Sequence, residues 1–301
     1  MKLSRLVLVI LPVLFLHMAA CTGFAPSVCP LDEHMPSFEN RYETDHFILK
    51  WTNESKHSKD NISDPRIVKD TAEYLEIAWA KYTGLFGRDP YTAPGQDKIE
   101  VVFWDIDCYG VSDPPDGPIQ FSAPAWVNIP SIRKPTSAHE LFHKLQYAYG
   151  YRTGWNPKDP YQWFSEGTAA WSEVFVWGRV SLDCKVDTLF KDTGKHLYEA
   201  DSMAMPFWVY FVQGNHEHPN NQLMMKYFER CEKLHDERLA LNEVIKETYG
   251  SVDGFFKEFE RERRNGFWTC ASTAPYRCIL GPGGNDLVEG VKNFQRKCRG
   301  N

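Results

Sequence analysis

The 301-residue sequence has no low-complexity block and no internal repeat, and its aromatic content of 14% is high, which together exclude a largely disordered chain. It also lacks a basic face. The formal net charge is −6, and the basic end "KNFQRKCRG" is too short to form a nucleic-acid platform. We therefore expect no nucleic-acid partner. With 43% hydrophobic residues, the chain can bury one substantial core.

The sequence lacks a C-x-x-C pair, so its cysteines are not spaced like a thiolate zinc cluster. The eight cysteines can pair completely, and such pairing would require an oxidising compartment. Cys270 and Cys278 are close enough in a proline-containing loop to bridge. The eight positions are Cys21, Cys29, Cys108, Cys184, Cys231, Cys270, Cys278 and Cys298.

The N-terminal apolar stretch, residues 6–16, is too short for a comfortable membrane span. It follows a charged start and precedes small residues, which predicts an export signal over 1–20, cleaved near Ala20. We expect a secreted protein with no integral membrane span after cleavage. Two alternatives stay open: a retained N-terminal anchor, and lipid attachment at Cys21 in a bacterial host. Lipid attachment would leave seven cysteines, an odd number, and Met18 fits that signal poorly.

The first half of the mature chain has strand character. Three stretches rich in β-branched and aromatic residues predict strands, and helical spacing of apolar residues predicts an amphipathic helix before the second strand. The predicted strands are 46–51, 98–107 and 125–130, and the predicted helix is 66–87.

Helical periodicity dominates the second half. Pro135, Thr136 and Ser137 supply start chemistry for a helix that carries "AHELFHKLQYA". A further helix is predicted over 161–178, and residues 186–260 are mostly helical, with breaks at "DSMAMP" and "GNHEHPNN".

This order of segments predicts an α+β fold. We expect one domain over 21–264, with a β-rich lobe to about residue 150, an active-site helix, and a mostly helical lobe after it. A cysteine-rich tail follows over 265–301.

The stretch "HELFH", 139–143, carries the clearest chemistry. Positions i and i+4 lie on one face of a helix, so His139 and His143 can aim both imidazoles at one ion. Glu140 is turned about 100° around the axis and can face the open side of the metal. Two imidazoles, a third protein ligand and water are the coordination set of a catalytic zinc. The alternative is an ordinary helix face with a salt-bridged glutamate.

The stretch "QWFSEGTAAWSE" offers the third ligand. Glu166 lies 23 residues after His143, and a second helix crossing the first can deliver it to the ion. Glu173 lies two turns later on the same face and can accept a hydrogen bond from a ligand imidazole. Both glutamates are exposed in the alternative reading, but the aromatic and alanine residues around Glu166 argue against this.

"HELFHKLQ" followed by "WFSEGTAAW" resembles the gluzincin zinc metallopeptidases, particularly the peptidase-MA-like group of secreted metalloproteases. The resemblance covers most of the chain and is more specific in the paired motifs than in the flanking strands. It implies a zincin-like fold and Zn²⁺ held by His139, His143 and Glu166. It also implies Glu140 as general base and acid.

The resemblance also implies an oxyanion-stabilising tyrosine. Tyr198 opens an apolar helical run after the third ligand, as the corresponding tyrosine does in gluzincin aminopeptidases. A core or rim tyrosine is the alternative, and Tyr210, deeper in that run, is expected in the core. The chain departs from the aminopeptidases in lacking a "GxMEN"-type stretch. It departs from thermolysin-like enzymes in having Ala170 four residues after Glu166.

His216 and His218, in "GNHEHPNN", are the rival metal ligands, and the polar stretch predicts that they lie on the surface. The leading hypothesis is a monomeric, secreted zinc peptidase, an endopeptidase acting on peptide or protein substrates. The segment "AWVNIP" is its candidate substrate-binding edge strand. The alternatives are an inactive zincin-fold binding module and a zinc hydrolase of a non-peptide substrate.

Overall fold

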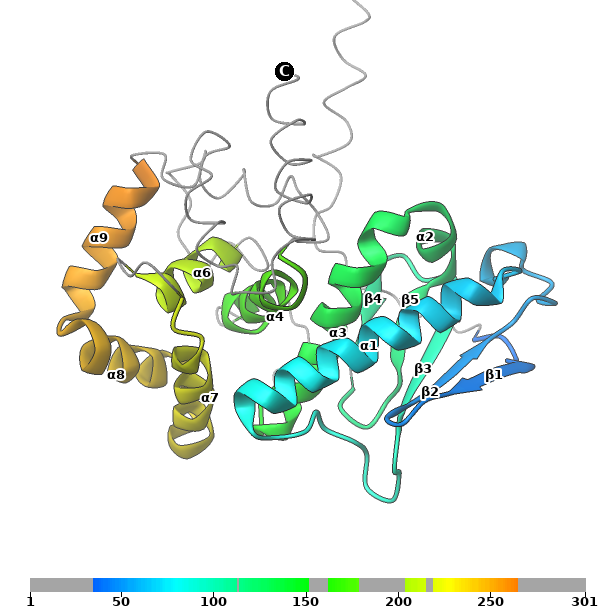
Figure 1. Ribbon diagram of the computed structural model, residues 1–301, viewed down its shortest axis with the longest axis horizontal. Helices are drawn as coiled ribbons and strands as arrows, with labels where there is room; N and C mark the ends of the chain where they lie inside the picture. Colours follow the sequence, from blue (N-terminus) through cyan, green and yellow to red (C-terminus); the bar gives the residue numbers. More distant parts are fainter. Residues whose placement is uncertain (1–34, 113, 152–161, 179–203, 215–218, 265–301) are drawn as a thin grey trace, which may run out of the picture.

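The structure is a computed structural model that describes residues 35–112, 114–151, 162–178, 204–214 and 219–264. It has an α+β architecture, in agreement with the predicted class. A mixed sheet and its covering helices occupy one side of the molecule in Figure 1, and a group of shorter helices occupies the other. The main hydrophobic core is one cluster that extends through both sides.

The sheet has five strands in the order β1-β2-β3-β5-β4. Strands β2, β3 and β5 run parallel, and β1 and β4 pair antiparallel at the two edges. The short strand β4 is therefore an edge strand. The bounds are β1 Asn40–Glu43, β2 Phe47–Trp51, β3 Ile99–Trp104, β4 Gly110–Val111 and β5 Ile119–Ser122.

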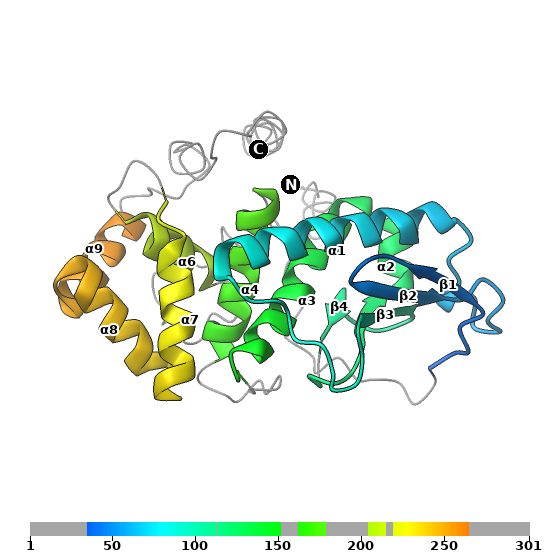
Figure 2. The same ribbon diagram turned by 60° about the horizontal axis from the view of Figure 1, so that its bottom comes forward.

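Strand β3 is apolar on both faces because both faces are buried. Val101 and Phe103 belong to the main core, whereas Val102 and Trp104 form a second, smaller cluster on the opposite face. Near-continuous apolar runs such as "VVFW" are typical of parallel strands in the middle of a sheet. Helices α1 (Pro65–Phe86) and α3 (Arg133–Ala148) belong to the same main core and contact each other (Figure 2), and α1 also contacts β2 and α3 contacts β4.

Helix α1 has well-defined ends. The side chain of Asp64 accepts a hydrogen bond from the Arg66 backbone N–H, Pro65 opens the helix, and Gly87 ends it with a φ of 62°. A proline in the first turn and a left-handed glycine after the last are the usual boundary signals. The predicted helix 66–87 therefore matches the structure to within a residue at each end.

Helix α3 (Arg133–Ala148) packs against α4 (Gln162–Trp177), which in turn contacts α6 (Met205–Gln213). Helices α7, α8 and α9 lie on the same side of the molecule as α6 in Figure 1. Their bounds are α7 Gln222–Leu234, α8 Glu237–Tyr249 and α9 Val252–Arg264. The described elements also include two short 3₁₀ helices, η1 Ser58–Asp60 and η2 Pro130–Ile132.

The predicted strand over 125–130 is wrong. These residues fall in helix α2 (Ala123–Asn128), in Ile129 after it and in the first position of η2. The Ser122 hydroxyl caps α2 by accepting from the Ala125 N–H. Trp126 is fully buried, and its ring stacks on Phe121 at 4.1 Å between centroids. This anchoring by the core outweighs the strand propensity of six residues.

The start of α3 also differs from the prediction. The helix begins at Arg133, directly after η2, and no side chain caps it. Pro135 is accommodated in the first turn, where backbone N–H groups have no helical partner. Ser137 donates its hydroxyl to the Arg133 carbonyl at 2.6 Å instead of capping the helix.

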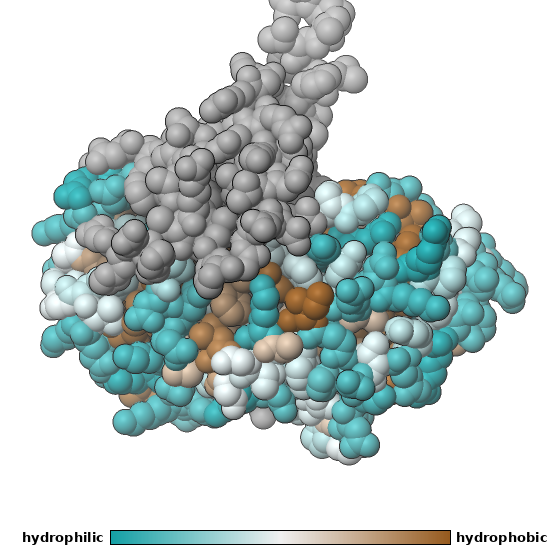
Figure 3. Space-filling model, viewed as in Figure 1, coloured by the Kyte–Doolittle hydropathy of each residue, from teal (hydrophilic) through white to brown (hydrophobic). Residues whose placement is uncertain are grey.

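The face of the molecule seen in Figure 3 is mostly hydrophilic over the described residues, with apolar residues in small separate patches. Val127 and Ile129 are among the exposed large apolar residues, at 40% and 38% exposed. Isolated residues of this kind are ordinary on protein surfaces. Within the described ranges, no helix combines the length and the apolar character that crossing a bilayer requires.

Candidate metal centre

Helix α3 places His139 and His143 one turn apart on the same face. Their ring centroids are 4.9 Å apart, and only 11% and 12% of the two side chains is exposed. The spacing of four residues accounts for this geometry, because it returns the chain to nearly the same angle around the helix axis.

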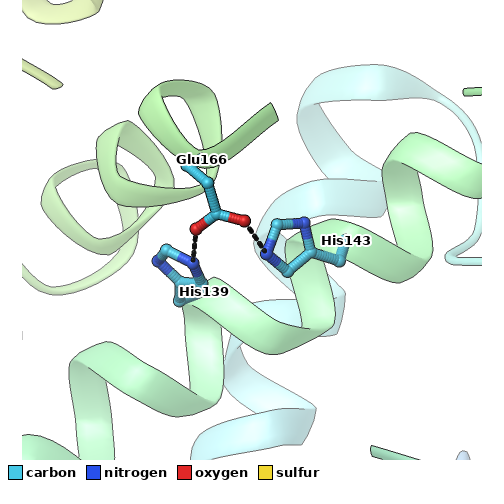
Figure 4. Close-up of side chains that lie close together, drawn as sticks. All are labelled: His139, His143 and Glu166. Atoms are coloured by element: carbon cyan, nitrogen blue, oxygen red, sulfur yellow. Dashed lines mark hydrogen bonds and ion pairs between the residues drawn. The ribbon is translucent and has the colours of Figure 1, made fainter. Parts of the chain in front are cut away.

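Helix α4 crosses α3 and brings Glu166 over the two rings. In Figure 4 the carboxylate lies between the imidazoles, with one oxygen toward each. The distances are 3.3 Å from Glu166 Oε2 to His139 Nε2 and 3.6 Å from Glu166 Oε1 to His143 Nε2. The candidate ligand atoms of all three residues lie within 4.8 Å of one another. The three predicted ligands are therefore close enough to hold one metal ion.

The ligand atoms lie about as close together as those around a bound metal ion. Ligands bound about 2.0–2.1 Å from a tetrahedral ion lie about 3.3 Å from each other. The separations of 3.3 and 3.6 Å run to different oxygens of Glu166, and all three ligand atoms lie within 4.8 Å of one another, so the three groups are close enough for one ion. Two imidazoles and a carboxylate are also the donor set of a catalytic zinc with one open position.

The far nitrogen of each imidazole has an acceptor. His139 Nδ1 lies 2.8 Å from Glu173 Oε1, and His143 Nδ1 lies 2.8 Å from Gln146 Oε1. Glu173 is almost fully buried at 2% exposed. When Nδ1 carries the proton and donates it to these oxygens, Nε2 is the nitrogen that can bind an ion. Glu173 thus occupies the supporting position predicted for it.

Two carboxylates control the charge of His139 in the metal-free protein. Burial by itself would lower the pKa of His139, but hydrogen bonds to Glu166 and Glu173 outweigh burial and raise its pKa from 6.5 to about 10. The site therefore attracts positive charge. A divalent cation at the same place would replace the Nε2 proton and neutralise the carboxylates.

Glu140 lies on the side of α3 that is next to the edge strand β4. It is 5% exposed, and this burial raises the pKa of its carboxyl group, although the two histidines oppose the shift. A Cβ atom at Gly110 in β4 would lie 2.7 Å from Glu140 Cγ, so only glycine leaves room for this side chain. The Ser112 hydroxyl also donates to the Glu140 backbone carbonyl at 2.7 Å.

The connection from β4 to β5 is fixed to α3 by a buried lysine. Lys144 is 1% exposed, and its Nζ donates to the carbonyls of Pro115 and Gly117 at 2.7 Å each. The edge strand and its following loop are therefore held against α3 at two places, one turn apart along the helix.

Sequence reasoning missed Gly110, Lys144 and Gln146. Gln146 could have been found, because it lies three residues after His143 and positions i and i+3 share a helix face. No local pattern pointed to Gly110.

Three predicted positions lie outside the described residues: Tyr198, His216 and His218. Tyr210 is buried at 2% exposed, against Phe255 and Phe259, which confirms its place in the core.

The chain matches no protein-family model, and a search of curated proteins finds no significant relative.

Proposed function

We propose that this protein is a zinc-dependent peptidase of gluzincin type with a zincin-like fold. The observation that carries the proposal is the close approach of His139, His143 and Glu166, whose ligand atoms lie within 4.8 Å of one another, with Glu140 beside them and Glu173 behind. The mixed sheet with an antiparallel edge strand next to α3 supports it, as does the resemblance of the paired motifs.

The residues of the site have separate roles in this proposal. A zinc ion bound here would polarise the substrate carbonyl and lower the pKa of the attacking water. Glu140 would accept the proton of that water and deliver it to the leaving amine. Tyr198 keeps its proposed role as an oxyanion donor.

Strand β4, and not the segment 125–130, is the proposed edge along which an extended peptide pairs. Its outer side pairs with no strand of the described sheet, and Gly110 lies against Glu140. A peptide that adds as a further strand would bring a backbone carbonyl next to the site. This geometry favours an endopeptidase, because no chain end has to be recognised.

We also propose that the protein is exported. Cys231 is a free, buried cysteine, so the eight cysteines do not all pair. Complete pairing therefore no longer argues against lipid attachment at Cys21. The lipid-anchored form stays an alternative. Six cysteines lie outside the described residues, and their pairing stays a prediction.

Metal content and turnover test the function directly. We expect about one zinc per chain by mass spectrometry of the purified protein, and none in the His139→Ala, His143→Ala double variant. Glu140→Gln should keep its zinc and lose about 10²–10⁴-fold in kcat on a peptide library. Ester and glycan substrates are tested in parallel.

Each outcome separates one alternative. A folded protein without zinc contradicts the proposal. Zinc without turnover of any substrate favours the binding module, and turnover of esters or glycans alone favours a non-peptide hydrolase. Full activity in Glu140→Gln would remove Glu140 as the base.

A further inference from the structure

The side chain of Gln146 is buried between the two helices that carry the proposed ligands. It lies on α3, three residues after His143, and is 1% exposed. Its amide oxygen lies nearest to His143 on its own helix and also accepts from the Ser165 hydroxyl of α4 at 3.3 Å, and its amide nitrogen contacts α4.

The contacts with α4 determine which end of the amide is the nitrogen. Gln146 Nε2 lies 2.9 Å from the backbone carbonyl of Ser165 and 2.9 Å from Thr168 Oγ1. A carbonyl only accepts hydrogen bonds, so the NH₂ group has to face Ser165. The Thr168 hydroxyl donates to the Phe164 carbonyl at 2.6 Å and is therefore left to accept from Gln146.

This orientation determines the hydrogen position on His143. With its NH₂ group committed to α4, Gln146 presents Oε1 to His143 Nδ1 at 2.8 Å. An amide oxygen is an acceptor, so Nδ1 has to carry the hydrogen. The lone pair of the neutral ring is then on Nε2, the atom that faces Glu166.

The same side chain also fixes the backbone next to the third ligand. Ser165, whose carbonyl accepts from Gln146, directly precedes Glu166 in α4. One amide therefore orients the imidazole of His143 and ties α3 to the turn of α4 that presents Glu166.

We propose that Gln146 is a positioning residue that couples His143 and Glu166, so that the two ligands bind zinc as a unit. This inference rests on the zinc site proposed above. Both hydrogen-bonded ends are needed for the coupling, because one sets the donor atom of the histidine and the other sets the position of the carboxylate.

Zinc affinity, measured by competition with a chelator, tests the coupling. Gln146→Leu removes both contacts and should raise the zinc Kd about 10–100-fold. Gln146→Glu keeps an acceptor for His143 but loses the donor to Ser165, so its Kd should lie between those of the wild type and Gln146→Leu. In a Glu166→Ala background, Gln146→Leu should weaken binding by a smaller factor than in the wild type, because part of its effect acts through Glu166.

A tautomer measurement gives a readout that needs no metal. In the metal-free protein at mildly alkaline pH, the ¹⁵N shifts of the His143 ring should show hydrogen on Nδ1, and Gln146→Leu should mix the two tautomers. Ser172→Ala is the matched control: Ser172 is fully buried between the same helices and bonds to Tyr82 and Ala138 instead of a histidine. It should lower the melting temperature and leave the zinc Kd unchanged.

The possible failures are distinguishable. If the wild type binds zinc and Gln146→Leu has the same Kd, the coupling is wrong and the zinc site stands. The same conclusion follows if the effects of Gln146→Leu and Glu166→Ala on the zinc Kd multiply independently. If Ser172→Ala weakens zinc as much as Gln146→Leu does, Gln146 acts only through general stability and the proposal is overturned. A wild type that binds no zinc overturns both the inference and the proposed function.

Discussion

At the scale of single residues, the site gathers more negative than positive charge. The carboxylates of Glu166 and Glu173 lie within hydrogen-bonding distance of His139, and Glu140 is buried beside them. Buried carboxylates are costly unless a cation or a hydrogen-bond donor compensates them. In the metal-free protein that cation is the imidazolium of His139, whose pKa is raised to about 10.

This charge balance predicts how the stability of the metal-free protein depends on pH. The pKa of His139 is higher in the folded state, about 10, than its ordinary value of 6.5. Its contribution to the free energy of unfolding is therefore complete below about pH 6.5 and is lost as the pH rises through about 10. With chelator present, the melting temperature should fall across this window more steeply in the wild type than in His139→Gln.

Zinc provides the control for this prediction. Coordination replaces the Nε2 proton, so saturating zinc should flatten the pH dependence of the wild type. Parallel curves for the wild type and His139→Gln in chelator would show that the paired charge of His139 contributes nothing to stability.

The sequence predicted the proposed metal ligands better than the residues that pack around them. Helical spacing places His139 and His143 on one face whatever the rest of the fold does, and the apolar neighbours of Glu166 argued against an exposed position; 19% of its side chain is exposed. Gly110 could not be found in this way. It touches Glu140 only because β4 pairs with β5 and lies against α3, and that contact depends on the whole sheet.

At the scale of secondary-structure elements, a glycine sets the distance between α4 and α6. A Cβ atom at Gly167 would lie 2.6 Å from Trp208 Nε1 and 2.9 Å from Ala204 Cβ. Because Gly167 follows Glu166 directly, this close packing also positions the third ligand. The side chain of Trp208 is fully buried and has little room to move.

We therefore expect Gly167→Ala to destabilise the protein by about 1–3 kcal/mol through overpacking. Gly84→Ala in α1 is the matched control, since a Cβ atom there meets nothing within 4 Å. Alanine in an open helical position should stabilise by about 0.5–1 kcal/mol. Denaturant unfolding of both variants measures the two effects, and equal changes in the two would show that α4 and α6 are not closely packed at Gly167.

The elements that sequence patterns predicted are the long ones. Helix α1 carries periodic apolar residues over 22 positions, and β3 is a β-prone run of six. The short elements were missed or misassigned because pairing and burial decide them. Strand β4 has two residues, one of them a glycine, and α2 has six residues anchored by Trp126. In such short segments, contacts distant in sequence outweigh local preference.

At the scale of the whole molecule, α1 joins the sheet side to the helical side. Arg88, two residues after its end, forms a bidentate pair with Glu232 in α7, at 2.8 and 3.0 Å, and donates to the Ala148 carbonyl at the end of α3. Its guanidinium also lies 4.1 Å from the ring centroid of Tyr149. The pair is part-exposed, so it contributes more to orientation than to stability.

The thiol of Cys231, on α7, is a natural reporter of how the two sides open. It is 7% exposed, and burial raises its pKa to about 12, although the nearby Tyr227 opposes this shift. The reactive thiolate should therefore form only when α7 separates from its neighbours. The rate at which a maleimide labels Cys231, followed by peptide mass spectrometry, measures the frequency of that opening.

Labelling with and without zinc would then show how far the molecule acts as one cooperative unit. Helix α7 packs on α1, α6 and α8 and carries none of the proposed ligands. If Cys231 is reached only through global unfolding, we expect zinc to slow its labelling by the same factor by which zinc stabilises the whole protein. A labelling rate that does not change with zinc would mean that α7 separates from its neighbours while the metal centre stays closed. The continuous core would then consist of two parts that unfold independently, and the reactivity of one buried sulfur would show it.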